Sequence, residues 1–431
     1  MLTPSTLRFR LPPLFALLLV LSACDSGEGS SLYDPDAGTG PAPVISSVGP
    51  EGVVLAGIDV VTIEGQNFSD DPALVRVVFD DQQGASAAGE ILSATPTRLE
   101  VQVPNLPNPA LRVRVAVVGA QAYSNAVSLP LTSAVTPFGD LDSGPGVREE
   151  PAAIIGDGSG ALYVSLSANG SAGGILRLSQ DGIREPFADS RVLWNDLSLG
   201  GPSDDRLFAT QSVQAIFELP AGRPVPPVLP NNRIRLTDVT ADASGVIWAG
   251  GAAGTPTNPI TESLYRFDLD GGVTETVFPG TVADLRAFDG FLYVAATRSG
   301  DTPEAKVWRL PIQADGTLGD PEVVYDVEAD QPGRRPSALA LAADGTVFVG
   351  IAPPASDPRA EVEFPVIRVS PDGTAAPLYP GVLPSPVSEL AWGAGSELYL
   401  VQSRIPPPAG ETGEPSPALL FRVETRLQGA P

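Results

Sequence analysis

The chain of 431 residues carries 51 acidic and 26 basic side chains, a formal net charge of −25, one cysteine and no histidine. This charge argues against binding to nucleic acid and against electrostatic attachment to anionic lipid. The missing histidine excludes imidazole catalysis, and a single cysteine excludes a disulfide within the chain. The length predicts more than one domain.

The first 23 residues have the pattern of an export signal. Arg8 and Arg10 precede the apolar run 14–21, which is too short to span a bilayer permanently. Directly after it come Leu21-Ser22-Ala23-Cys24, which resemble a bacterial lipobox and imply cleavage before Cys24 and lipid on that residue. The alternative is an ordinary signal with an incidental cysteine. We expect a lipoprotein of the cell envelope, anchored to a membrane through Cys24, on the periplasmic side or at the cell surface.

The next two segments differ sharply in composition. Residues 24–40 are rich in Gly, Ser and Asp and predict a flexible linker. Residues 41–132 alternate apolar and polar positions between Gly and Pro, which predicts a small all-β sandwich. Its expected strands are Val44–Val48, Val60–Glu64, Leu74–Phe79, Arg98–Val103, Leu111–Val117 and Ala126–Leu129.

Several spaced motifs in this sandwich resemble the immunoglobulin-like IPT/TIG domain. They are Pro43–Pro50, Val61–Phe68, Leu99–Pro104 and Tyr123–Ala126. Within the second motif, Gly65 and Asn67 fit a tight turn that places Phe68 in the core. The resemblance implies a spacer or binding module and implies no chemistry.

From residue 133 onwards an apolar-aromatic-apolar strand pattern recurs six times, with its aromatic residues 40 to 55 positions apart. The six aromatic residues are Tyr163, Phe208, Trp248, Tyr293, Phe348 and Tyr399. A unit such as 238–278 cannot bury both of its faces alone and needs similar neighbours. A period of roughly 40 to 50 residues with four strands is typical of a propeller blade. We therefore predict an all-β protein: an immunoglobulin-like β-sandwich followed, over 133–431, by a six-bladed β-propeller of four-stranded antiparallel blades.

Asp-Gly pairs mark the expected hairpins between these strands, because they supply the positive backbone angles that two-residue turns need. They are Asp157-Gly158, Asp181-Gly182, Asp270-Gly271, Asp289-Gly290, Asp315-Gly316, Asp344-Gly345 and Asp372-Gly373. The sixth repeat has no outer strand of its own, whereas residues 134–138 look like the outer strand at 184–187. We predict that this upstream segment completes the last blade and closes the ring.

The first strand of each blade lines the central channel. Alignment on the aromatic residues places six residues in one column when the turn after the first strand is taken as one residue shorter in the fourth blade and as longer in the second. They are Ala153, Asp196, Asp238, Asp284, Ala338 and Glu389. Four carboxylates at a narrow mouth would repel one another unless protonation or a cation, calcium with oxygen ligands, relieved them. Asn195 is the neighbouring amide that would join such a metal site. The simpler interpretation is a solvated acidic rim.

Across residues 134–425 the blade pattern resembles NHL-repeat proteins and the gluconolactonase/regucalcin-like (SMP-30) lactonases. Those lactonases hold a divalent metal at the channel mouth with acidic and amide side chains. The resemblance rests on the blades and on no catalytic motif, so we assign no catalytic residue.

Two functions remain open at this point. The first is a non-catalytic binding protein that presents a glycan, peptide or protein ligand site on the long loops 250–261, 298–305, 352–363 and 404–416. The second, implied by the resemblance, is a calcium-dependent lactonase or related hydrolase that uses metal and carboxylate. Loops that merely tolerate insertion, and a purely structural spacer, are the plainer alternatives.

Overall fold

The computed structural model describes the chain from residue 40, with short gaps. The described residues are 40–139, 141, 147–188, 192–200, 206–211, 215–220, 227–230, 234–242, 244–253, 262–268, 271–298, 304–407, 411 and 413–430. The expected signal, Cys24 and the linker up to residue 39 lie outside them. In this described part, no helix has the length and apolar character needed to cross a membrane.

The chain divides into two compact units. The first holds the described residues up to Glu51 together with Val60–Gln102 and Ala110–Leu129, and the second holds Gly52–Asp59, Val103–Pro109 and the chain from Pro130. In the second unit, β2 (Val54–Leu55) pairs in parallel with β9 (Leu131–Thr132).

The first unit is a two-layer β-sandwich. Its strands, in the hydrogen-bonded order, are β1 (Val44–Gly49), β3 (Val60–Gln66), β6 (Arg98–Gln102), β5 (Ser86–Thr95), β4 (Val75–Asp80), β7 (Arg112–Val117) and β8 (Val127–Ser128). β5 belongs to both layers, because its residues 86–89 pair with β4 and its residues 90–95 pair with β6. Alternate residues of β3 and β4, such as Ile63 and Phe79, are fully buried. This confirms the immunoglobulin-like sandwich.

The turn that follows β3 also confirms the packing role expected for Phe68, which is 6% exposed. Asn67 supplies the left-handed backbone with φ 62°. Gly65 is needed for a close approach, since a Cβ there would lie 2.0 Å from the carbonyl oxygen of Val44. Glycine therefore allows β1 and the Phe68 ring to approach β3 together.

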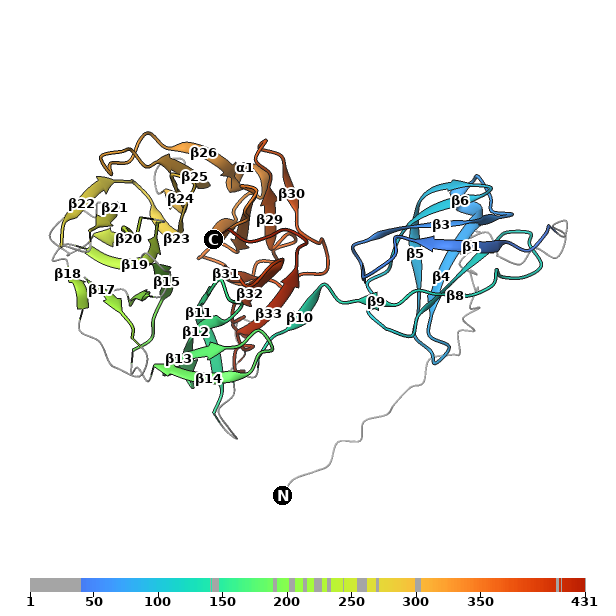
Figure 1. Ribbon diagram of the computed structural model, residues 1–431, viewed down its shortest axis with the longest axis horizontal. Coiled ribbons are helices and arrows are strands. Elements are labelled where there is room, and N and C mark those ends of the chain that lie inside the picture. Colours follow the sequence, from blue (N-terminus) through green and yellow to red (C-terminus); the bar gives the residue numbers. More distant parts are fainter. Residues whose placement is uncertain are drawn as a thin grey trace, which may run out of the picture. The chain divides into compact units, whose positions relative to one another are not determined.

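The second unit is a ring of six four-stranded sheets, numbered here as blades one to six in chain order (Figure 1). Blades one to three are β11 (Glu149–Gly156), β12 (Leu162–Ala168), β13 (Ser171–Leu178), β14 (Arg184–Ala188); β15 (Asp196–Gly200), β16 (Arg206–Thr210), β17 (Ala215–Glu218), β18 (Pro227–Pro230); and β19 (Ile234–Ala241), β20 (Ile247–Ala253), β21 (Glu262–Phe267), β22 (Val273–Val277). Blades four to six are β23 (Thr281–Phe288), β24 (Phe291–Arg298), β25 (Glu304–Pro311), β26 (Glu322–Asp326); β27 (Arg335–Leu341), β28 (Val347–Ala352), β29 (Val366–Val369), β30 (Ala375–Pro377); and β31 (Val387–Trp392), β32 (Glu397–Gln402), β33 (Leu419–Glu424), β10 (Val135–Pro137). A one-turn helix, α1 (Val327–Asp330), follows β26. The six-bladed propeller is confirmed.

The last blade is completed from upstream, as predicted. β10 pairs antiparallel with β33, so that Val135 lies opposite Val423. The N–H of Phe138 then donates to the carbonyl oxygen of Leu420 at 2.9 Å, and the Phe138 ring lies 4.7 Å from the ring of Tyr399. Chain segments almost 300 residues apart thus close the ring, and β10 covers the edge that β33 would otherwise expose.

The six aromatic residues occupy equivalent places. Each pairs with one position of the third strand, and that position is arginine in five blades, as in Tyr293↔Arg309 and Tyr399↔Arg422. In blade two the partner of Phe208 is Glu218 instead. There Arg206 of the second strand lies over the Phe208 ring at 5.0 Å and pairs with Glu218 at 2.7 Å.

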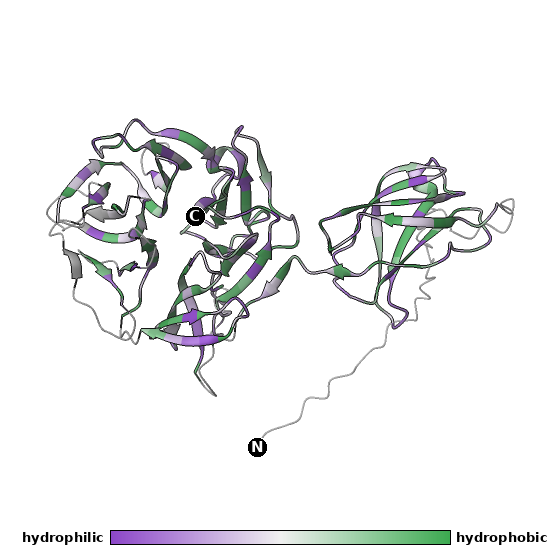
Figure 2. Cartoon of the chain, viewed as in Figure 1, coloured by the Kyte–Doolittle hydropathy of each residue, from purple (hydrophilic) through white to green (hydrophobic). Residues whose placement is uncertain are grey.

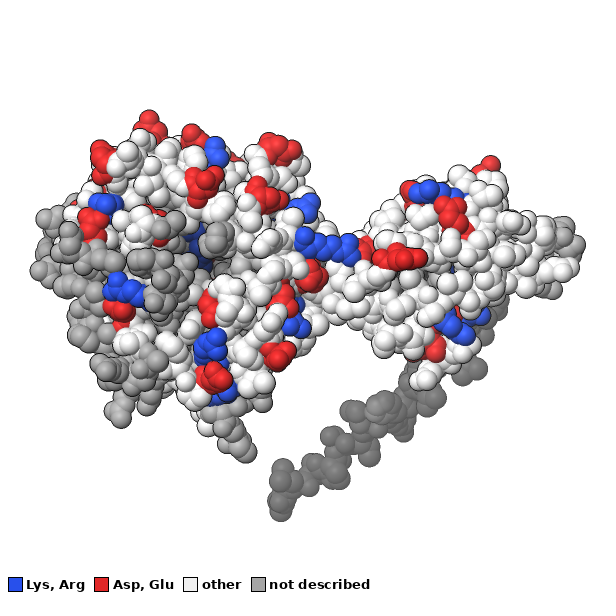
Figure 3. Space-filling model, viewed as in Figure 1, with Lys and Arg blue, Asp and Glu red and all other residues white. Residues whose placement is uncertain are grey.

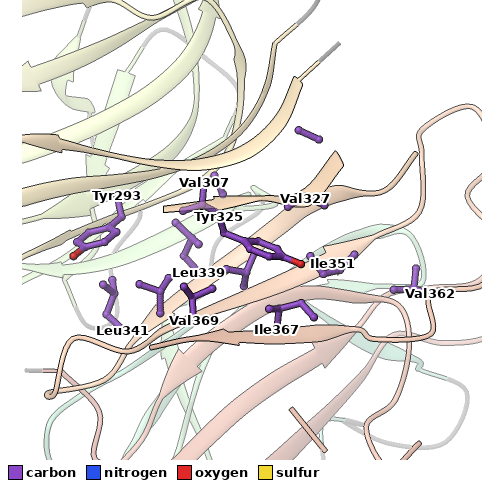
Figure 4. Close-up of a cluster of buried hydrophobic side chains, with 14 residues drawn as sticks. Tyr293, Val307, Tyr325, Val327, Leu339, Leu341, Ile351, Val362, Ile367 and Val369 are labelled. Carbon is purple, nitrogen blue, oxygen red and sulfur yellow. The ribbon is translucent and has the colours of Figure 1, made fainter. Parts of the chain in front are cut away.

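The apolar core lies largely between neighbouring blades. Around Tyr293 of blade four, side chains of β25 such as Val307 meet side chains of blade five such as Leu339 and Ile367 (Figure 4). Apolar residues follow the strands of both units (Figure 2). On the face seen in Figure 3, acidic side chains are scattered and the basic ones form no broad patch. The blades are therefore held together chiefly by burial of strand faces.

The predicted turn type was wrong at most Asp-Gly pairs. Only Asp289 and Gly290 both have positive φ, at 48° and 75°. In the others that are described, glycine alone is left-handed and the turn is one residue longer; Gln313 N–H, for example, donates to Thr317 O around Gly316. These glycines are Gly182, Gly271, Gly316, Gly345 and Gly373, whereas Gly160 takes this place in the turn at Asp157. Asp270 lies outside the described residues.

Candidate functional site in the central channel

The aligned column of six residues has one structural position. Each member lies opposite the residue two places after the aromatic residue of its blade, as in Asp238↔Gly250 and Glu389↔Val401. In every blade except the second, a one-residue bulge immediately precedes the column residue. A bulge redirects the side chains beside it, and its repetition keeps the column in register around the channel.

The three aspartates of the column join successive blades. Asp196 Oδ2 accepts the N–H of Val239 at 2.7 Å, and Asp238 Oδ1 accepts the N–H of Leu285 at 2.8 Å. Asp284 Oδ2 accepts the N–H of Leu339 at 2.5 Å. Each bond runs from the first strand of one blade to the first strand of the next, so blades two to five are linked by carboxylates. A solvated rim does not describe these aspartates, which are only 3%, 5% and 3% exposed.

A second level of the same kind lies two residues further along the strands. Ser198 Oγ accepts the N–H of Ala241 at 3.0 Å, and Thr240 Oγ1 accepts the N–H of Ala287 at 3.4 Å. The corresponding residue of blade four is Arg286. The backbone N–H groups on the channel side of these first strands have no neighbouring strand to bond to, and side chains of the preceding blade accept their hydrogen bonds instead.

Sequence reasoning missed Arg286, which the structure places among the acidic residues. Its Nη1 lies 2.7 Å from Asp284 Oδ1 and donates to the carbonyl oxygen of Leu285 at 2.7 Å. The charges of Asp196, Asp238 and Glu389 also act on its guanidinium. The available signal was the strand period of two, which puts Arg286 on the same side of β23 as Asp284.

Burial alters the ionisation of the whole cluster. Desolvation raises the pKa of Asp284 to about 7, with the charge of Arg286 opposing the shift. Desolvation also raises the pKa of Asp196, and raises the pKa values of Asp238 and half-buried Glu389 well above their ordinary range. The cluster therefore retains protons at pH values where an exposed carboxyl group has lost its own.

This ionisation predicts that stability falls with rising pH. The folded state binds more protons than the unfolded state between about pH 4 and the raised pKa values, and each such proton lowers the free energy of unfolding by about 1.4 kcal/mol per pH unit. We expect a lower thermal midpoint at about pH 8 than at about pH 5, and a smaller difference in Asp238→Asn. Asp315→Asn is the control, because hydrogen bonds to Thr317 lower the pKa of this exposed turn residue, which titrates below that window. An undiminished pH dependence in Asp238→Asn would contradict the assignment.

The arrangement does not fit the calcium site that the sequence left open as one possibility. Calcium takes six to eight oxygen ligands, yet one oxygen of each aspartate already accepts a backbone N–H and a guanidinium lies among the carboxylates. Within the described ranges, no three acidic or cysteine side chains form a group that would hold a metal ion. Asn195 directly precedes β15, where its N–H donates to the carbonyl oxygen of Thr210 at 2.8 Å.

An ion-pair network ties blade six to blade one where the first strands begin. Arg404, which follows β32, donates through Nε and Nη2 to Glu150 Oε2 at 2.9 and 2.6 Å. Arg148 lies 2.9 Å from the other oxygen of Glu150, a residue 4% exposed, and 3.6 Å from Glu414. The connection between β32 and β33 is therefore fixed to the first strand of the ring.

Comparison with known proteins defines the class to which these domains belong. Residues 43–130 match the model of the IPT/TIG domain, and residues 198–401 match the model of the SMP-30/Gluconolactonase/LRE-like region. The protein therefore carries an IPT/TIG domain followed by a six-bladed propeller of the gluconolactonase/regucalcin-like type. A search of the curated proteins finds no significant match.

The solved structures to which this chain is similar have low sequence identity to it. A structural genomics protein of unknown function from Bacteroides thetaiotaomicron is 13% identical, with 91% of this chain and 99% of that chain covered and a TM-score of 0.47. Luciferin-regenerating enzyme is 16% identical, with coverages of 66% and 98% and a TM-score of 0.49. The calcium-binding protein regucalcin from Agrobacterium tumefaciens is 16% identical, with coverages of 67% and 94% and a TM-score of 0.45.

Proposed function

We propose that this protein is a non-catalytic binding protein of the cell envelope, anchored through lipid on Cys24, whose propeller binds a glycan, peptide or protein outside the cytoplasm. The observation that supports it best is the use of the channel aspartates. One carboxylate oxygen of each of the three aspartates accepts a backbone N–H of the next blade, so these side chains serve to link the blades. Because the channel aspartates hold the blades together, we place the ligand site on the loops between the second and third strands.

The loop face, which is the face of the propeller that carries the connections between second and third strands, provides a preformed scaffold for such a ligand. In the connection between β28 and β29, the carbonyl oxygen of Pro353 accepts from Arg335 Nε at 2.9 Å, and that of Glu361 accepts from Arg334. Phe364 O accepts from Gln331 Nε2 at 3.5 Å. Long loops held on a rigid scaffold are common binding elements. The expected loops 250–261 and 298–305 lie mostly outside the described residues.

Cross-linking on intact membranes, followed by mass spectrometry of the captured molecule, tests the binding role, and a glycan array tests sugars separately. Replacing residues 354–360 by a Gly-Ser segment of equal length should abolish capture. The same replacement at 313–317, a turn between third and fourth strands on the opposite face, should leave it unchanged. Equal capture by both variants would contradict binding at the loop face.

Lipid attachment has its own test. The N-terminal peptide of the mature protein should carry the mass of lipid on Cys24, and Cys24→Ser should move the protein out of the membrane fraction. An unmodified N-terminal peptide that begins elsewhere would remove the anchor from the proposal without affecting ligand capture.

A second candidate, a calcium-dependent lactone hydrolase, is favoured by the match of residues 198–401 to the SMP-30/Gluconolactonase/LRE-like region. It predicts hydrolysis of a panel of lactones in calcium, abolished by EDTA and by Asp238→Ala. Our proposal expects no turnover above the rate of the Asp238→Ala variant. Calcium-dependent turnover that this substitution removes would replace binding by catalysis as the main role.

A further inference from the structure

The channel of the propeller concentrates acidic groups in a place that water barely reaches. Asp196, Asp238 and Asp284 are each at least 95% buried, and Glu389 is half-buried beside them. Buried carboxylates need a compensating charge, because removing them from water costs several kcal/mol per ion. In the lactonases that this propeller resembles, a divalent metal at the channel mouth supplies this charge.

Here one arginine meets that need. At the level of Arg286, two residues after the column, the other first strands carry only uncharged residues. They are Ile155, Ser198, Thr240, Ala340 and Ala391. In the column itself, blades one and five have Ala153 and Ala338. Arg286 is thus the only cation among these twelve inner-strand positions, and all four carboxylates act on it.

The contacts of Arg286 indicate a role through charge. Its Nη1 pairs with Asp284 at 2.7 Å, whereas Nη2 is buried without a hydrogen-bond partner among the described residues. Asp284 Oδ1 faces Nη1 but likewise lacks a well-directed hydrogen bond. An arginine positioned for hydrogen-bond geometry would use its donors fully. These orphan atoms instead fit a cation set among several acids.

We propose that Arg286 is a resident counter-ion that takes the place of a divalent metal in this channel. Because a guanidinium stays protonated at every physiological pH, the charge is permanent and needs no supply of free cation. It is also attached to β23, so it cannot dissociate. The ring would then keep its buried, blade-linking aspartates without depending on calcium.

Charge-changing variants of the full chain test this proposal through their thermal midpoints. Arg286→Met should lower the midpoint by roughly 5 °C or more, since it leaves buried carboxylates without compensation. Arg286→Lys should lower the thermal midpoint by less than Arg286→Met does. The double variant Asp284→Asn/Arg286→Met should recover part of the loss, because it also removes the carboxylate left unpaired. If Arg286→Met does not fold, a folded double variant supports the proposal in its place.

The control is Arg309→Met, which removes an arginine from an exposed pair with Glu322 in the same blade. It should shift the midpoint by only about 1 to 2 °C. Arg286→Lys as damaging as Arg286→Met, with no recovery in the double variant, would make Arg286 a packing residue and overturn the proposal. So would a rise of the wild-type midpoint in calcium over EDTA that Asp238→Asn abolishes.

Discussion

Tyr293→Ala is expected to lower the free energy of unfolding of the propeller by about 3–5 kcal/mol, because it removes a buried ring and leaves a cavity. Tyr293 is 6% exposed and packs at the boundary between blades four and five, near Leu341 (Figure 4). Val323→Ala, on the outer strand of the same blade and 55% exposed, should cost less than about 0.5 kcal/mol.

Chemical denaturation followed by circular dichroism measures both variants. The propeller transition should move to a lower denaturant concentration in Tyr293→Ala alone. Because the two side chains belong to one blade, an equal effect of both changes would mean that blade contacts do not hold the ring. An unchanged Tyr293→Ala transition would contradict the register of the blades.

Phe138→Ala should destabilise the closure of the ring by a similar amount, about 3–5 kcal/mol. Phe138 is 5% exposed, lies against Tyr399 and follows β10, the strand supplied from upstream to blade six. Loss of the Phe138 side chain should release β10 from blade six. β33 would then be an edge strand whose amides exchange with solvent.

Hydrogen exchange of the peptides from β10 and β33 tests this expectation. Exchange of Leu419–Glu424 should accelerate in Phe138→Ala, while peptides of blade three, on the far side of the ring, change less. Thr136→Ala is the matched control on β10, because its side chain is not part of the buried cluster around Phe138. Unaltered exchange of β33 in Phe138→Ala would show that the upstream strand does not close the blade.

The repeating parts of this fold were predictable from the sequence because every blade uses the same register. The aromatic residues identified the second strands, and counting back from them placed Asp238 and Glu389 in one column. This worked because the column residue lies ten positions before the aromatic residue in four of the six blades, and the turn between the first and second strands differs in length only in blades two and four. The bulge lies on the other side of the column residue and does not enter this count.

The contacts between blades were not predictable in the same way. The backbone N–H groups that donate to Asp196, Asp238 and Asp284 lie 43, 47 and 55 residues further along the chain, and only the packing of neighbouring blades brings donors and acceptors together. An acidic column therefore suggested a metal, whereas the folded chain satisfies it with backbone donors and with Arg286. The strand period of two places Arg286 on the channel side, but its role depends on carboxylates from three other blades.

The turn type at most Asp-Gly pairs was predicted wrongly for a local reason. The Asp-Gly pair was read as a two-residue turn, yet at Asp315 the aspartate side chain accepts the N–H of Thr317 and only Gly316 is left-handed. The aspartate thus stabilises a three-residue turn through its side chain. The hairpin was predicted correctly where the backbone conformation of its aspartate was not.

Calcium binding to the wild-type protein, measured by isothermal titration calorimetry with Asp238→Asn as the reference, tests most directly whether the channel is a metal-free structural core. With Arg286 as the compensating charge, the two titrations should be indistinguishable and show no site in the channel. One calcium ion bound per wild-type chain and absent from Asp238→Asn would contradict this account.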